Sequence, residues 1–332
     1  MGPARRCFSA AYIGLMVRTA AWIGVLALLL AGCGGEEASN SPARRTVTLA
    51  LDFQPNAVHA GILSARDEGA AWRRGLDLEV RTPSSSSDSL KLLVTGRADV
   101  AVVDIHDLGL ARERGVDVVG VGAIVQRPLA AVIAAPGIRR PRDLEGKRVG
   151  VTGLPSDDAV LTSVVEADGG DPEAVRRTTI GFAAVSSLVA RRVDAVVTFW
   201  NAEGVALRER GVRTREFRVD DFGAPRYPEL VLATTSKTLK DEPGLVRDTV
   251  AALKEGTREA LADLPATAKR VAQASDGEAG LVRAQLDAVA PALQPAFELN
   301  RGALERWARF DERFGILQSP PEVEEAFALE LR

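Results

Sequence analysis

A group of polar and aromatic side chains follows the first apolar segment of the chain. The sequence LDFQPNAVHAG, residues 51–61, comes after an alternating apolar run and precedes a helical pattern. Asn56 and His59 are three residues apart and share one helix face, beside Phe53. Gly61 allows a backbone or a ligand to approach closely. In open α/β sheets ligands bind at the carboxyl ends of strands, so this segment predicts half of a ligand site.

A second segment of the same kind is TFWNAEG, residues 198–204, which follows the apolar run 193–197. Trp200 offers a flat face for a heteroaromatic ring, and Glu203 can accept two N–H bonds or pair with a protonated ring. A carboxylate reads the amino group of cytosine in the same way. Alternatively, Trp200 belongs to the core and Glu203 completes a helix cap with Asn201. The position at the end of a strand favours the ligand site.

A serine run at residues 84–87 opens a predicted helix. Its hydroxyl and N–H groups could hold an anion, as at other helix N-termini. We favour a capped helix, with Ser87 or Asp88 as the cap and one hydroxyl facing the ligand. An anionic ligand would also require a cation nearby, for which Arg127 is the candidate.

The two histidines of the chain, His59 and His106, do not form a catalytic or metal-binding pattern. We interpret His59 as a hydrogen-bonding wall residue, because no Ser/His/Asp grouping or GxGxxG loop occurs. His106, in the sequence DIHD, either lines the cleft or begins a helix. The cysteines are Cys7 and Cys33, so we expect no disulfide, no metal site, no cofactor and no catalytic residue.

The apolar period alternates between that of strands and that of helices, which indicates βαβ units and largely parallel sheets. Strands are expected at 46–51, 76–82, 98–104, 116–125 and 129–135, and in a second series at 148–152, 175–180, 193–199, 212–217 and 229–235. Helices are expected at 157–168, 183–190, 201–210, 245–261, 266–274, 278–288, 303–314 and 322–331.

The late strand at 229–235 predicts that the chain crosses twice between two α/β lobes. Proline-marked segments suited to a hinge occur at 126–129 and 223–228. The predicted lobes are therefore 46–127 plus 225–332, and 128–224. Hinged lobes of this kind close on ligands, and Gln126 at the hinge joins the candidate ligand-binding residues.

The N-terminal region predicts export and a lipid anchor. Ala20–Ala31 is almost entirely apolar and follows Arg18, as in a signal peptide with a short apolar region. Leu30-Ala31-Gly32-Cys33 has the form of a bacterial lipobox, with Cys33 lipidated; the alternative is a plain secretory signal. Residues 1–32 then form the signal peptide and 33–45 a solvated tether. Met16 is an alternative start to Met1.

The charge pattern argues against nucleic acid as a partner, because the net charge is −3 and no basic block follows the signal. The expected membrane contact is the lipid on Cys33. We expect a monomer on the extracytoplasmic face of the cell membrane.

Three segments carry a resemblance to a known family. LDFQPNAVHAG, TFWNAEG and the sequence YPELVL at 227–232 resemble the NMT1/THI5-like group of thiamine-pyrimidine-precursor binding proteins, from Thr46 onward. The sequence DLEGKRVG at 143–150 also occurs in the wider family of periplasmic solute-binding proteins. The resemblance implies a type II periplasmic binding protein fold, in the α/β class, and delivery of a ligand to an ABC permease.

The resemblance also implies ligand-lining roles for particular residues. They match the motifs PN-x-x-H and WN-x-E and the aromatic residue before PELVL, whereas Phe53 stands where many members have tryptophan. The residues are Phe53, Asn56, His59, Trp200, Asn201, Glu203 and Tyr227.

The sequence therefore predicts a solute-binding lipoprotein of an ABC importer, not an enzyme. The expected ligand is a small heteroaromatic, a thiamine-related aminopyrimidine. Two alternatives remain: another ligand, such as a riboflavin-related ring or a sulfonate, or an enzyme of pyrimidine precursor synthesis. Enzymes of the wider group use a cysteine-rich segment that handles iron, and no cysteine follows Cys33 in this chain.

Overall fold

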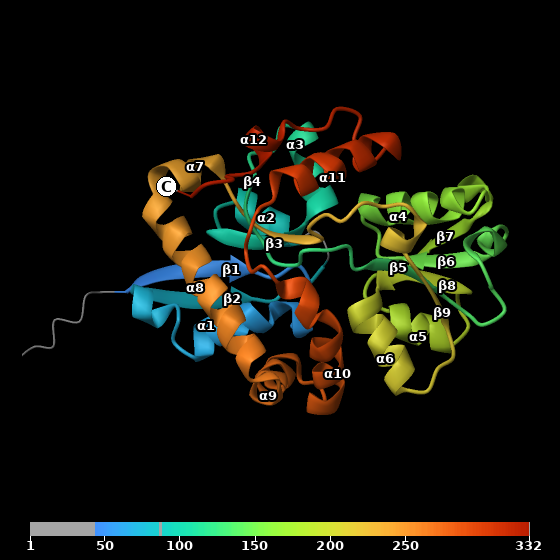
Figure 1. Cartoon of the computed structure of the whole chain (residues 1–332), viewed down its shortest axis with the longest axis horizontal. Helices are drawn as coiled ribbons and strands as arrows, with labels where there is room; N and C mark the ends of the chain where they lie inside the picture. The colour runs from blue at the N-terminus through green and yellow to red at the C-terminus, as the bar shows by residue number, and fades with distance from the viewer. Residues whose placement is uncertain (1–43, 86–87, 332) are drawn as a thin grey trace, which may run out of the picture. The chain divides into compact units, whose positions relative to one another are not determined.

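Two five-stranded sheets form the framework of the computed structural model, which describes residues 44–85 and 88–331 (Figure 1). The first sheet has the order β2-β1-β3-β10-β4 and the second β7-β6-β8-β5-β9. Both belong to one compact unit of the chain. The strands are β1 Arg45–Ala50, β2 Leu76–Arg81, β3 Val100–Asp104, β4 Val119–Ala123, β5 Ala130–Ala134, β6 Arg148–Val151, β7 Arg176–Thr179, β8 Ala195–Phe199, β9 Arg215–Arg218 and β10 Leu230–Thr234.

All ten expected strands are present within one to three residues of the expected bounds, but the sheets are mixed. In the first sheet β10 runs antiparallel to both neighbours, and in the second β5 does so. The other strands of each sheet share one direction. Each reversed strand directly follows a crossing segment: β5 follows the first crossing and β10 follows the second. Each therefore enters its sheet from the far end.

Helices cover the faces of both sheets. We call the first sheet and its helices lobe 1, and the second sheet and its helices lobe 2. Lobe 2 contains α4 Pro155–Ala167, α5 Ala184–Val189 and α6 Val205–Glu209. Lobe 1 contains α1 Ala60–Asp67, α2 Asp88–Val94, α3 Ile105–Glu113, α7 Ser236–Asp241, α8 Pro243–Ala262, α9 Leu264–Ser275, α10 Ala279–Val289, α11 Arg301–Arg313 and α12 Val323–Ala326.

The helix expected at 322–331 is wrong beyond its first turn, since α12 ends at Ala326. The next residue, Phe327, forms a bridge with Gly120 of β4 and is 1% exposed. A Cβ atom on Gly120 would lie 2.4 Å from the Phe327 ring, so the ring occupies the space that the glycine leaves. Burial of this ring and pairing with β4 outweigh the helical pattern.

The two crossing segments are hydrogen-bonded to each other. The amide of Ile124 donates to the carbonyl of Leu230 (2.8 Å), and the amide of Glu229 donates to Val125 (3.0 Å). The buried carboxylate of Glu229 accepts the amide of Leu129 at 2.9 Å, where the chain enters lobe 2. The hinge therefore consists of two hydrogen-bonded segments with the buried carboxyl group of Glu229 between them.

The predicted signal peptide, the lipidated Cys33 and nearly all of the tether lie outside the described residues. Within the described residues, none of the helices combines the length and the apolar character needed to cross a bilayer.

Close packing of α1 on α8 fixes one face of lobe 1, as seen where α1, α8 and α9 lie together in Figure 1. The backbones meet at Gly61 and Gly256. A Cβ atom on Gly256 would lie 2.4 Å from the Gly61 carbonyl oxygen and 2.5 Å from the Ala65 amide nitrogen. Gly61 therefore admits a neighbouring helix, and not a ligand.

We expect Gly256→Ala to lower the free energy of unfolding by about 1–3 kcal/mol, because the new methyl group meets backbone atoms that cannot rotate away. Urea denaturation followed by circular dichroism measures this. The control is Gly280→Ala in α10, where nothing lies within 4 Å and the change should leave stability equal or slightly higher. Equal effects at the two positions would contradict the packing argument.

Candidate functional site

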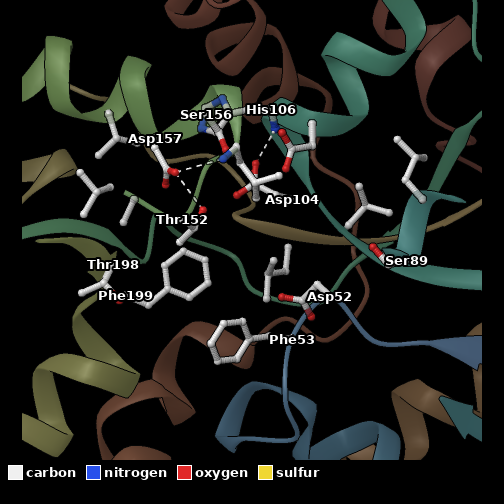
Figure 2. A pocket seen from close by; sticks show the side chains of 18 of the residues that line it. Asp52, Phe53, Ser89, Asp104, His106, Thr152, Ser156, Asp157, Thr198 and Phe199 are labelled. Carbon is white, nitrogen blue, oxygen red and sulfur yellow. Dashed lines mark hydrogen bonds between the residues drawn. The ribbon is translucent and has the colours of Figure 1, made fainter. Parts of the chain in front are cut away.

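A cavity of about 290 Å³ lies between the carboxyl-end loops of the two sheets (Figure 2). Its wall includes residues that follow β1, β3, β6 and β8, together with the first turns of α3 and α4. Loops at the ends of strands are free of ladder hydrogen bonds, so their side chains and amides can face a ligand.

Three phenylalanine rings form the aromatic part of the wall: Phe53, Phe182 and Phe199. Phe53 belongs to lobe 1 and Phe182 to lobe 2, and their ring centroids are 4.2 Å apart in an edge-to-face arrangement. Figure 2 shows the Phe53 and Phe199 rings in the cavity. A flat heteroaromatic ligand could stack on these faces.

Asp52 is the carboxylate that the PN-x-x-H segment holds in place. The ring of His59 is fully buried, and its Nε2 lies 2.8 Å from Asp52 Oδ1. Its Nδ1 accepts the backbone amide of Asn56 (3.2 Å), so the ring proton is on Nε2 and is donated to Asp52. Asn56 caps the helical turn by accepting the amide of Val58 and also lines the cavity. Asp52, and not His59, reaches the cavity.

In lobe 2, two carboxyl groups each follow a threonine that lies at the end of a strand. Thr152 follows β6, and its hydroxyl donates to Asp157 Oδ2 at 2.8 Å (Figure 2). Burial raises the pKa of Glu203, and Thr198 in β8 acts in the opposite direction, so its side chain lies beside the Glu203 carboxyl group. Each threonine precedes its carboxylate by five residues, so both loops carry the pattern T-x-x-x-x-[DE]. Both carboxylates line the cavity.

A buried network backs the lobe 1 wall. His106 is 1% exposed; its Nδ1 lies 2.7 Å from Asp311 Oδ1, and its Nε2 lies 3.1 Å from the Tyr227 hydroxyl. Burial disfavours the charged imidazole, but the attraction of Asp311, with Asp104 and Glu229, raises the pKa of His106 to about 10. His106 both begins α3 and lines the cavity, so the two alternatives from the sequence are compatible.

The cavity wall is strongly acidic. Among the described residues it has five carboxyl groups, and the cationic side chains are Arg114, which is exposed, and His106, which is paired with Asp311. Burial raises the pKa of Asp104 to about 6, although the charge of His106 opposes this. The carboxyl groups are those of Asp52, Asp104, Asp107, Asp157 and Glu203.

Four other predicted ligand-binding residues are not part of the cavity wall. Trp200 is 4% exposed; its indole N–H donates to the Pro128 carbonyl, and the Arg218 guanidinium lies 4.2 Å from its ring centroid. The preceding residue, Phe199, lines the cavity instead, because successive residues of an extended chain point to opposite sides. Gln126 donates to the Pro295 carbonyl at the hinge, at 2.7 Å.

Asn201 and Tyr227 are both fully buried. Asn201 follows Trp200 in a π-helical turn, Trp200–Gly204, and neither polar atom of its amide has a hydrogen-bond partner. Tyr227 contacts the His106 ring edge-on and supports it from behind the cavity wall. These residues surround the site without reaching the cavity.

The features that could have held an anion are satisfied within the protein. The backbone amides of Ser84 and Ser85 donate to Asp88 Oδ2 at 2.9 Å, so this carboxylate takes the place of an anion. Ser87 lies outside the described residues. The guanidinium of Arg127 is paired with Asp220.

The sequence interpretation missed five wall residues that matter: Asp52, Asp107, Asp157, Phe182 and Phe199. The repeated T-x-x-x-x-[DE] pattern after two predicted strands could have identified Asp157. No local signal distinguishes Phe182, whose position depends on how the two lobes meet. Within the described residues no group of three or more His, Cys, Asp or Glu side chains has the arrangement of a metal site.

Comparison with known proteins assigns the family. The model of the family described as NMT1/THI5 like matches residues 56–268, which is more than half of the chain. The chain belongs to the NMT1/THI5-like family. A relative in this family, the formylaminopyrimidine-binding protein of Halalkalibacterium halodurans, is 36% identical over 64% of this chain. The match spans 66% of that protein's length.

Other relatives are named for an enzymatic activity instead of for binding. The 4-amino-5-hydroxymethyl-2-methylpyrimidine phosphate synthase THI5 of Saccharomyces cerevisiae is 25% identical over 65% of this chain and 67% of its own. Among solved structures, the alkanesulfonate-binding protein SsuA from Xanthomonas axonopodis pv. citri has a TM-score of 0.70 at 18% identity. It covers 86% of this chain and 98% of its own. The two mixed sheets and this likeness confirm the type II periplasmic binding protein fold.

The buried acids and the histidine of the NMT1/THI5-like chain make its stability depend on pH. Burial and the nearby charge of Asp104 raise the pKa of Glu229 from 4.5 to about 8, so between these values the folded chain holds a proton that the unfolded chain releases. The raised pKa of His106 acts in the same direction from pH 6.5 to about 10. Stability should therefore fall as pH rises from 5 to 9, by up to about 1.4 kcal/mol per pH unit for each group.

Thermal unfolding at pH 5, 7 and 9 measures this dependence. In Glu229→Gln the decline between pH 5 and 8 should be shallower, because the amide oxygen can still accept the Leu129 amide but does not titrate. A stability that rises over this range, or a decline unchanged by the substitution, would show that these groups are not buried as described.

Proposed function

We propose that this chain is the solute-binding protein of an ABC importer and captures a small amino-bearing heteroaromatic, a thiamine-related aminopyrimidine. The observation that carries the proposal is the cavity wall, which combines three phenyl rings with carboxylates from both lobes. The rings stack on a heteroaromatic ligand, and a carboxylate accepts the N–H groups of an exocyclic amine. The name of the formylaminopyrimidine-binding relative supports the same class of ligand.

The ligand-binding roles proposed for Phe53, Asn56 and Glu203 follow from their positions in the wall. To these we add Asp52 and Phe199. The roles proposed for the other residues are indirect: His59 orients Asp52, Tyr227 supports His106, and Trp200, Asn201 and Gln126 shape the hinge.

A sulfonate or nitrate is a poor fit to this wall. An anion would be buried among five carboxyl groups, and Arg127 is already paired with Asp220. SsuA, the sulfonate-binding neighbour, shares the fold at 18% identity. A shared fold at this identity does not imply a shared ligand.

The mechanism we propose is capture without chemistry. The lobes close on the ligand and present a joint surface to a permease, and the amide of Gln285 in α10 already contacts Ala202 of lobe 2 at 3.2 Å. The chain would act as a monomer on the extracytoplasmic face, held by a lipid on Cys33. Because some relatives are named as synthases, a control should test whether this chain alters a bound pyrimidine. Any bound pyrimidine is recovered after incubation and identified.

Isothermal titration with 4-amino-2-methylpyrimidines tests the proposal. We expect binding, with Glu203→Gln weakening it by more than about 1 kcal/mol, or fivefold in Kd, if the carboxylate accepts the amino group. Glu209→Gln, an exposed change on α6, is the matched control and should not alter Kd. Binding of sulfonates or flavins, but of no pyrimidine, by the wild-type chain would contradict the proposed ligand class.

A further inference from the structure

Asp107 and Asp157 come from different lobes and meet at the cavity. Asp107 lies in the first turn of α3 and Asp157 in the first turn of α4, and these two helices contact each other. The hydroxyl of Ser156, next to Asp157, acts to lower the pKa of Asp107, so this side chain lies beside the Asp107 carboxyl group. Both carboxyl groups line the cavity.

Asp157 is held firmly and still has an oxygen to offer. It is 8% exposed, and its Oδ2 accepts the Thr152 hydroxyl (2.8 Å) and the amides of Gly153 (2.9 Å) and Leu154 (3.2 Å). No such bond reaches Oδ1 from the described residues. Because Asp157 lines the cavity and its Oδ1 has no protein donor there, this oxygen can accept a hydrogen bond from a ligand.

The charges around this pair are not balanced. Burial raises the pKa of Asp107, and the like charges of Asp104 and Asp157 raise it further. The imidazolium of His106 opposes this shift but is already paired with Asp311. A cation in the cavity would offset both the loss of hydration and the repulsion between the carboxyl groups. A neutral hydroxyl group could donate a hydrogen bond but would not offset the repulsion.

The pair lies close to the proposed ring site. Strands β6 and β8 are parallel neighbours with Gly150 opposite Val196, and the same register places Thr152 opposite Thr198. Asp157 and Glu203 follow these threonines on neighbouring strands, and both carboxyl groups line the same cavity.

We propose that Asp107 and Asp157 form a second polar subsite that takes a protonated amine on the ligand. Resting on the proposed function, this narrows the ligand to a cationic pyrimidine with an aminomethyl substituent, in preference to a hydroxymethyl or formylaminomethyl substituent. The two carboxylates bind the ammonium group from opposite lobes, so the ligand charge itself favours closure.

Titration of three 4-amino-2-methylpyrimidines at pH 7 tests the inference, with aminomethyl, hydroxymethyl and formylaminomethyl groups at position 5. The wild type should bind the aminomethyl compound at least tenfold more tightly than the other two. Asp107→Asn and Asp157→Asn should each remove most of this preference, while the Kd for the hydroxymethyl compound changes less than threefold. Circular dichroism checks that both variants fold. If Asp157→Asn, at the buried position, does not fold, Asp107→Asn at its half-buried position still tests the subsite.

Asp158→Asn is the matched control, because the Asp158 side chain is 61% exposed and pairs with Arg177 outside the cavity. It should leave the preference unchanged. Equal or tighter binding of a neutral pyrimidine by the wild type would overturn the amine subsite while leaving the proposed function intact. Binding of no pyrimidine at all would overturn the proposed function, and this inference with it.

Discussion

The gathering of five buried or half-buried carboxyl groups around one cavity is the constraint that organises this molecule. A carboxylate removed from water needs hydrogen bonds or a counter-charge, and each loop at the cavity supplies some. His59 donates to Asp52, and Thr152 and two backbone amides donate to Asp157. The protein satisfies its own acids only in part. The amino-bearing ligand that we propose would supply further hydrogen-bond donors, whereas an anion would add a like charge.

A further buried carboxyl group, that of Glu229, connects the site to the hinge. Glu229 lies on the returning segment and accepts an amide from the outgoing segment, and it also contributes to the raised pKa of His106 behind the cavity wall. Trp200 fixes the other side of this junction through its bond to the Pro128 carbonyl. Trp200, which the sequence suggests as a ligand contact, thus binds a crossing segment, and its neighbour Phe199 faces the cavity.

The type II framework explains why relatives with different names share one architecture. The sheets and crossing segments position the loops, and the loop side chains decide what is held. In the sulfonate-binding neighbour the same framework serves an anion, whereas here the acid-rich loops present hydrogen-bond acceptors. Phe53 also fits this view: with a phenyl group where many family members have an indole, Phe182 of the other lobe packs edge-on against it.

The sequence by itself determined the ten strands, the two crossings and the family, because these depend on local period, proline positions and short motifs. It also located both loops that meet at the cavity. Only the tertiary structure decided which side chains face that cavity, since a shift of one residue in an extended segment reverses the direction of a side chain: Phe199 points in and Trp200 points away. The placement of Asp107 and Asp157 in one cavity wall likewise depends on the contact between two helices from different lobes, α3 and α4, which no local sequence pattern predicts.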